Sequence, residues 1–172
     1  MDMQTTKLKG VAGDLGKRIP FEQVEEELYV NLLRAFEHAS GVVGGVIKTF
    51  GLSEPQYNVL RILRGHEQLH EADPRPEGPG VACGKIGAQM VSREPDVSRL
   101  IDRLEKAGLV ERERCEHDRR VVRAVLTDAG RDKVDAIDAP LRAAFREAFG
   151  SLGAGDIETL NRALYVVHGH GE

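Results

Sequence analysis

The sequence has few cysteines and no long apolar segment. Cys83 and Cys115 are the only cysteines in 172 residues, and 32 positions separate them. Two cysteines at this distance match neither a disulfide framework nor a paired zinc spacing, so we expect free thiols. No apolar run approaches the roughly 20 residues of a membrane span, and the segment from Met1 to Lys9 lacks the apolar core of a secretory signal. These absences predict a cytoplasmic protein with no membrane partner.

The sequence also lacks an overall excess of positive charge. Lysine and arginine total 24 against 28 aspartates and glutamates, which gives a formal net charge of −4. The charge is uneven, because residues 81–131 hold 11 basic and 9 acidic side chains, residues 1–80 hold 9 and 12, and residues 132–172 hold 4 and 7. A locally basic middle between two acidic arms favours a nucleic-acid partner, although only weakly.

Two amphipathic helices are predicted in the first third of the chain. Apolar residues recur every three or four positions from Phe21 to Phe50, which is the spacing of one buried helix face. Ser53 then supplies an N-cap, Pro55 a first-turn proline and Gln56 the third position of a capping box. We expect this second helix to end near Gly65.

A surface loop, a helix-turn-helix and a β-hairpin are predicted next. Three prolines and two glycines within residues 73–80 disfavour the backbone hydrogen bonds of both an α-helix and a β-sheet. The predicted elements after this loop are a short helix at 83–90, a helix from Ser92 or Glu94 to Ala107, strands at 109–114 and 121–126, and two helices after the Thr127 cap. The expected fold class is mainly α with a small β-hairpin wing.

The second helix of this pair and the hairpin tip carry side chains suited to DNA. An α-helix fits the major groove, and a cationic hairpin tip reaches the flanking minor groove. Arginine pairs bidentately with guanine or with a phosphate. The candidate recognition residues are Arg93, Asp96, Ser98, Arg99 and Arg103, and the candidate wing residues are Asp118, Arg119, Arg120 and Arg123. The alternative is a solvated helix face with neighbouring opposite charges.

Three segments in the second half of the chain form one pattern. They are residues 104–112 (Leu-Glu-Lys-Ala-Gly-Leu-Val-Glu-Arg), then Asp118-Arg119-Arg120, and then Leu126-Thr127. This pattern resembles the signature of the MarR family of bacterial regulators. The resemblance covers roughly residues 21–168. It implies a winged helix-turn-helix with N- and C-terminal dimerisation helices, and a homodimer that binds a pseudo-palindromic operator in double-stranded DNA. By this match Asp118 and Arg120 take the family's wing positions. The long connection from His66 to Val81 and the early Pro95 depart from the family pattern.

This resemblance gives a division of the chain and a function. The expected parts are a flexible N-terminal arm at 1–20, a dimerisation helix at 21–52, a DNA-binding region at 53–126 with a loop insertion at 65–80, and dimerisation helices at 127–172. The expected function is sequence-specific transcriptional regulation, as a repressor relieved by a small ligand or by oxidation. A helical interaction module that only resembles a winged helix is a further alternative. We expect no enzymatic activity and no required cofactor.

His66-Glu67-Gln68-Leu69-His70 matches the pattern H-E-x-x-H, which supports two other interpretations. On a helix, the two histidines would lie one turn apart as zinc ligands, with Glu67 as the general base of a metallopeptidase. The segment has no clear third ligand and comes just before the Pro/Gly loop, so the peptidase is disfavoured. A metal-responsive regulator that uses His66 and His70 is the second alternative. The favoured interpretation is an exposed polar helix end.

Two kinds of effector site are candidates. The family resemblance implies that a phenolic or aromatic acid can enter a cleft, and here Phe36, His38, Tyr57 and Arg61 would supply apolar walls and one anionic anchor. Core packing is the default role of Phe36 and Tyr57. Cys83, near a helix start, and Cys115, in the wing turn, are candidate redox residues. For Cys83 a buried packing role is favoured.

Overall fold

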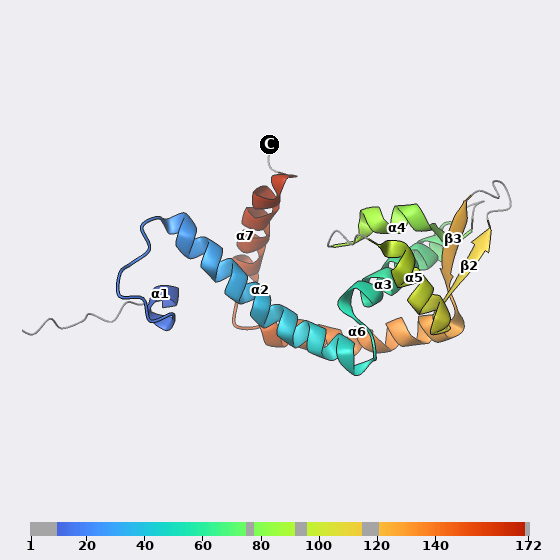
Figure 1. The fold of residues 1–172 in the computed structure, drawn as a ribbon, viewed down its shortest axis with the longest axis horizontal. Helices are drawn as coiled ribbons and strands as arrows, with labels where there is room; N and C mark the ends of the chain where they lie inside the picture. The colour runs from blue at the N-terminus through green and yellow to red at the C-terminus, as the bar shows by residue number, and fades with distance from the viewer. Residues whose placement is uncertain (1–9, 75–77, 92–95, 115–120, 171–172) are drawn as a thin grey trace, which may run out of the picture. The chain divides into compact units, whose positions relative to one another are not determined.

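The computed structural model describes residues 10–74, 78–91, 96–114 and 121–170 of the chain. Helices dominate it, and it contains one small antiparallel sheet, so the predicted fold class is confirmed (Figure 1). The elements in chain order are α1 (Gly10–Asp14), α2 (Val24–Thr49), α3 (Glu54–Ala72), β1 (Val81–Ala82), α4 (Cys83–Gln89), α5 (Val97–Lys106), β2 (Val110–Arg114), β3 (Val122–Leu126), α6 (Asp128–Phe149), α7 (Ala154–Tyr165) and the short π-helical segment η1 (Val166–His170). None of the helices in the described ranges has the length and apolar character needed to cross a bilayer.

The chain divides into two compact units. Met1–Val42 and Ala148–Glu172 make up the terminal unit, and Val43–Glu147 make up the winged-helix unit. The winged-helix unit contains the main core, in which α3, α4, α5 and the sheet pack together. Its most deeply buried large side chains are Leu60, Ile86, Ile101, Leu104, Ile137, Val59 and Val110. The predicted recognition helix and wing both belong to this unit.

The sheet has three strands, one more than the predicted hairpin. The strand order is β1-β3-β2, with Val81 opposite Ala124 and Ala82 opposite Arg123. The two longer strands pair from Val110 with Leu126 to Arg114 with Val122. The strand β1 was missed because two residues are too short to show the alternation by which a strand is recognised in sequence. Its addition covers one edge of β3.

The helix α3 runs to Ala72, so the predicted end near Gly65 was wrong. Its start is as predicted, because Ser53 Oγ accepts from the Gln56 backbone and Gln56 Oε1 accepts from the Ser53 backbone. The helix stops at Asp73 because Pro74 follows, and the residue before a proline is disfavoured in the helical region. Residues 65–72 are therefore helical, and the loop insertion that was predicted at 65–80 begins only after them.

The helix α5 begins at Val97, later than the predicted start at Ser92 or Glu94. Asp96 is its N-cap, and its carboxylate accepts a hydrogen bond from Arg99 N at 3.0 Å. Aspartate is among the preferred N-cap residues because its side chain satisfies a backbone donor that the first turn leaves open. Residues 92–95, which include the candidate Arg93, lie outside the described residues.

A glycine and threonine junction joins α5, β2 and α6. Gly108 has a positive φ of 70° and turns the chain out of α5, so that Leu109 N bonds back to Leu104 O at 2.9 Å. Thr127 Oγ1 donates to Gly108 O at 2.7 Å and accepts from Gly130 N at 3.0 Å. The junction fixes the end of α5 against both neighbouring elements, and Thr127 caps α6 as predicted.

The first 20 residues are not wholly a flexible arm. They contain α1, in which Val11 and Ala12 are buried. The carboxylate of Asp14 lies 3.7 Å from Arg34 of α2, and the Lys17 ammonium lies 3.8 Å from the centre of the Phe21 ring. Apolar burial and these charge contacts order the segment from residue 10 onward, whereas residues 1–9 lie outside the described residues.

Candidate nucleic-acid interface

The helix α5 separates its side chains into a buried face and an outward face. Leu100, Ile101 and Leu104 are buried against α3, α4 and β2. The predicted recognition residues Ser98, Arg99 and Arg103 are exposed. The apolar spacing therefore anchors the helix and leaves one polar, cationic face free for a partner.

Asp96 and Arg99 form an ion pair at the start of α5. Arg99 Nε lies 2.8 Å from Asp96 Oδ2, and the Arg99 side chain is 78% exposed. An exposed pair of this kind contributes at most about 1 kcal/mol, so a phosphate can displace it at little cost. The Asp96 carboxylate is already used by the cap and by Arg99, which makes it a positioning group for the arginine. Its predicted direct contact with DNA stays a prediction.

Arg112 of β2 holds α5 to the wing. Its guanidinium bonds to Asp102 Oδ1 at 2.6 Å, to Glu105 Oε2 at 2.5 Å and to Ser98 O at 3.3 Å. Partial burial of Arg112 disfavours its charged form and so acts to lower its pKa. The hydrogen bonds to Asp102 and Glu105 have the larger effect and raise the pKa of Arg112 above its ordinary value. The angle between the recognition helix and the hairpin is thereby restrained.

No individual role for Arg112 was predicted from the sequence. Its partners precede it by seven and ten positions across the turn at Gly108, a spacing that matches neither a helix nor a strand neighbour. The sequence held only a weak sign of this contact, namely that two acidic residues of α5 precede an arginine on the strand that follows it. Only the packing of α5 on β2 brings these groups together.

The wing residues are described only in part. Asp118, Arg119 and Arg120 lie outside the described residues, as does Cys115. Arg123 of β3 is half-buried, and its Nη1 donates to Gly80 O at 3.2 Å, next to β1. The β2–β3 register also places Glu113 opposite it. Arg123 therefore lies one pair in from Arg114 and Val122, where the described strands end beside the wing turn, and its predicted contact with DNA stays a prediction.

The central glutamate of H-E-x-x-H is engaged in a charge network between α3 and α6. The Glu67 side chain is 13% exposed, and its oxygens accept from Arg131 Nε at 2.8 Å and from Arg64 Nη1 at 3.0 Å. Arg64 also pairs with Asp135 of α6. Both carboxylate oxygens of Glu67 are engaged by arginines, so the side chain is not positioned to take a proton from a water molecule. The network links α3 to α6.

The two histidines of the motif lie on α3, in its last two turns. His66 Nε2 lies 3.1 Å from Gln89 Oε1 of α4, and both histidines line a small cavity beside β1. Within the ranges that the structure describes, no cluster of three or more histidine, cysteine or acidic side chains has the geometry of a metal site. The use of His66 and His70 as metal ligands stays a prediction.

The candidate effector residues fall into both units. In the winged-helix unit Tyr57 is buried, and burial together with the nearby Asp138 raises its pKa, against the opposing effect of Arg61. Arg61 Nη2 donates to Asn58 Oδ1 at 2.9 Å. Phe36 and His38 are exposed on α2 in the terminal unit. Cys83 is half-buried against the core as the first residue of α4, which agrees with its favoured packing role.

Comparison with known proteins agrees with this geometry. A family model described as the MarR family matches residues 52–122. The uncharacterized HTH-type transcriptional regulator YkoM of Bacillus subtilis (strain 168) is 30% identical over 126 residues, which cover 70% of this chain and 73% of the relative. The HTH-type transcriptional repressor IacR of Pseudomonas putida is 23% identical over 122 residues, with 71% and 66% covered. The crystal structure of a MarR transcription factor from Planctomyces limnophilus is 33% identical, covers 86% of this chain and 99% of that chain, and has a TM-score of 0.59.

Proposed function

Because this chain belongs to the MarR family of transcriptional regulators, we propose that it binds double-stranded DNA as a homodimer, with α5 of each subunit in the major groove. The observation that carries the proposal is the division of α5 into an anchored apolar face and an exposed face with Ser98, Arg99 and Arg103. The Arg112 clamp and the Gly108 junction hold that face at a fixed angle to the wing. A preset angle lets helix and hairpin contact adjacent grooves together.

The apolar surface of the terminal unit supports a dimer. Large apolar side chains on α2 and on the α7 and η1 segment are at least one third exposed, namely Val24, Leu28, Tyr29, Leu33, Phe36, Ile157, Leu160, Tyr165, Val166 and Val167. A monomeric protein seldom leaves this many large apolar groups in water, so they favour an interface. In a two-fold dimer the α5 helices would meet successive major grooves of a pseudo-palindromic operator, about one helical turn apart.

Repression by occupancy is the regulatory outcome that we infer. A dimer seated on a promoter excludes polymerase from the same DNA, and one of the similar proteins is a repressor by name. Because its target is DNA, the protein would act in the cytoplasm. Relief by a small phenolic or aromatic acid, or by oxidation of Cys83 or Cys115, would follow from any change in the spacing of the two winged-helix units, since both must fit their half-sites at once.

Fluorescence anisotropy over a salt series tests the proposal. Purified protein is titrated into DNA from its own upstream region, with random duplex as competitor. We expect binding that survives the competitor and weakens steeply with salt, because phosphate contacts release counterions. Arg99→Ala with Arg103→Ala should weaken binding and lower the log–log salt slope by about two.

A matched control makes this result specific to α5. Arg142 is an exposed arginine of α6, paired only at the surface with Asp138 at 3.8 Å. Arg142→Ala with Arg146→Ala removes the same two charges from a helix that is not proposed to enter DNA, and it should leave the salt slope unchanged. Equal losses in the two variants would mean that only overall charge matters, and they would remove α5 from the interface.

A further inference from the structure

The exposed cations of α5 lie along one line of the helix. Arg99, Arg103 and Lys106 are spaced by four and three residues, so they follow one another on the same face. All three are exposed, whereas Leu100 and Leu104 are buried on the opposite side. Like charges four residues apart repel one another and destabilise a helix. The stripe therefore costs stability in the free protein, and an anionic partner relieves that cost.

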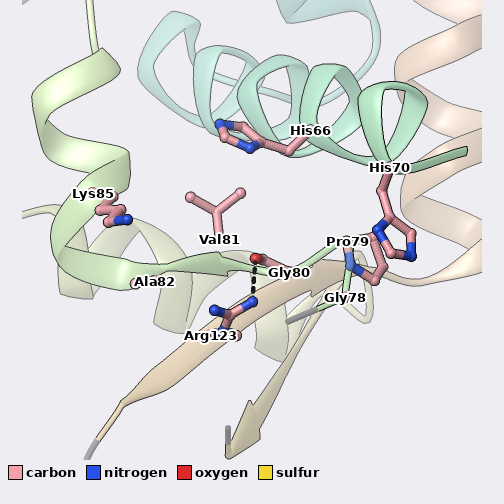
Figure 2. Close-up of a pocket in the computed structure, with 9 residues that line it drawn as sticks. All are labelled: His66, His70, Gly78, Pro79, Gly80, Val81, Ala82, Lys85 and Arg123. Atoms are coloured by element: carbon pink, nitrogen blue, oxygen red, sulfur yellow. Dashed lines mark hydrogen bonds between the residues drawn. The ribbon is translucent and has the colours of Figure 1, made fainter. Parts of the chain in front are cut away.

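Two other arginines of the winged-helix unit are already tied to protein groups. Arg123 Nη1 donates to Gly80 O at 3.2 Å, as Figure 2 shows, and Arg112 is held by two carboxylates of α5. Arg103 and Lys106 differ, because within the described parts of the chain neither side chain makes an ion pair or a hydrogen bond. They can follow a phosphate, whose contacts need charge but little fixed geometry.

Arg99 is restrained by Asp96, unlike the other two cations of the stripe. Asp96 Oδ1 accepts from Arg99 N at 3.0 Å, and Asp96 Oδ2 lies 2.8 Å from Arg99 Nε. One carboxylate thus caps the helix and orients the guanidinium. The ion pair is closest at Nε, the inner nitrogen, and neither Nη atom makes a hydrogen bond within the described residues. The two Nη groups remain available to a second partner.

A base edge suits this ion pair better than a phosphate does. A phosphate that displaced Asp96 from Arg99 would leave the Asp96 carboxylate beside it, and two neighbouring anions repel each other. The uncharged edge of a base causes no such repulsion. Arginine recognises guanine by two parallel hydrogen bonds, to O6 and N7, from a guanidinium presented end-on. The Nη groups that Asp96 leaves open provide this arrangement.

The order of these residues along α5 agrees with such a division. In a helix-turn-helix the N-terminal residues of the second helix contact base edges. Arg99 is the third residue of α5, and Lys106 is the last. The seven positions that separate them span about 10 Å of helix, close to the roughly 12 Å width of the major groove. A first turn at the base edges therefore brings the last turn near the phosphates at the edge of the groove.

We infer that Arg99, positioned by Asp96, reads a guanine in each half-site, while Arg103 and Lys106 bind phosphates of the DNA backbone. The inference rests on the proposed function and assigns roles that it leaves open. Sequence preference then comes from the first turn of α5. The salt-dependent part of the affinity comes from the rest of the helix.

Selection from random DNA tests the base readout without a known operator. Duplexes with a randomised stretch of about 20 base pairs, long enough for two half-sites, are bound by the full-length chain, recovered and sequenced. We expect a guanine at one symmetric position of each half-site. Arg99→Ala should lower the preference for that guanine about tenfold or more and leave the other preferred positions unchanged.

The variant Asp96→Asn separates the helix cap from the ion pair. Asparagine caps a helix about as well as aspartate does, but it has no charge to hold the guanidinium. The preference for the same guanine should therefore fall, while circular dichroism shows that the helices are retained. An unchanged preference would overturn the positioning role of Asp96.

Fluorescence anisotropy over a salt series, on the selected duplex, tests the phosphate contacts. Arg103→Ala and Lys106→Ala should each lower the log–log salt slope by about two, since a homodimer loses one phosphate contact per subunit. Both variants should select the same sequence as the unaltered chain. Lys48→Ala is the matched control, because Lys48 is an exposed lysine in the last turn of α2 and should leave the slope unchanged.

The outcomes distinguish this inference from the function on which it rests. A chain that binds no duplex at all would overturn both. Binding that selects no guanine dependent on Arg99 would overturn the inference alone. A salt slope that falls by about two in Arg99→Ala, with the selected sequence unchanged, would assign Arg99 to the backbone and also overturn the inference alone. Equal slopes in Lys106→Ala and Lys48→Ala would remove Lys106 from the phosphate contacts.

Discussion

Gly130 shows how strongly a single residue can be fixed by packing. A Cβ at this position would lie 2.0 Å from Leu109 O, a backbone atom that cannot turn aside. The close approach lets the first turn of α6 rest on the start of the wing, where Thr127 caps the helix. Gly45 of α2 is under no such constraint, since a Cβ there would meet nothing within 4 Å.

We therefore predict opposite effects of two identical substitutions. Gly130→Ala should lower the free energy of unfolding by about 1–3 kcal/mol, because the added methyl group overpacks the junction. Gly45→Ala should raise it by about 0.5–1 kcal/mol, because alanine is the better helix former. Chemical denaturation of both variants measures the two changes. Equal stability of Gly130→Ala and the unaltered chain would show that the junction can open at no cost.

At the scale of secondary-structure elements, Arg112 connects α5 to β2. Asp102 and Glu105 come from α5, Arg112 comes from β2, and the turn at Gly108 separates them in sequence. The side chain of Arg112 is 25% exposed, whereas those of its partners are 51% and 41% exposed. The carboxylates can be hydrated if the arginine is lost, so the contribution to stability is moderate and the contribution to orientation is the larger one.

Arg112→Met tests this role. We expect a loss of about 1–2 kcal/mol in the free energy of unfolding, together with weaker DNA binding, because the helix and the hairpin lose their common restraint. Arg114→Met, at an exposed position on the same strand, is the control for stability and should change it by less than about 0.5 kcal/mol. A variant that kept full stability and full DNA affinity would show that the clamp does not restrain the interface.

At the scale of the whole molecule, the two units differ in how far they bury their large apolar side chains. The winged-helix unit buries its own core, in which Leu60 and Ile101 have no exposed surface. In the terminal unit, half of the Leu33 surface and 42% of the Leu160 surface are exposed. A second copy of the chain is the partner that the proposed function supplies for these surfaces.

Leu33→Asp should consequently dissociate the proposed homodimer. A carboxylate in the core of an interface loses its hydration when the dimer forms, whereas in the monomer the same position is exposed to water. The substitution therefore destabilises the dimer relative to the monomer. Sedimentation velocity over a range of protein concentrations measures the change, and DNA binding should fall with dimerisation. Glu37→Gln, at an exposed polar position of the same helix, is the control. A dimer that persists in Leu33→Asp would place the interface elsewhere.

The sequence by itself determined the order of the longer helices and of the two longer strands, and it located the helix-turn-helix. Caps, glycine turns and helical apolar spacing are local signals, so Ser53, Gly108 and Thr127 could be read from neighbouring residues alone. The end of α3 was misplaced because Gly65 is only a weak helix breaker, while Pro74 is a strong one.

Only the tertiary structure decided which distant side chains meet. The ion pairs of Arg112 and of Glu67, and the pairing of the edge strand β1, all join residues that lie on different elements. Such contacts produce no regular spacing in the sequence, because they depend on how helices and strands pack in three dimensions. The two histidines that the sequence offered as alternative metal ligands, for example, lie near β1 and β3 only because α3 packs against the sheet.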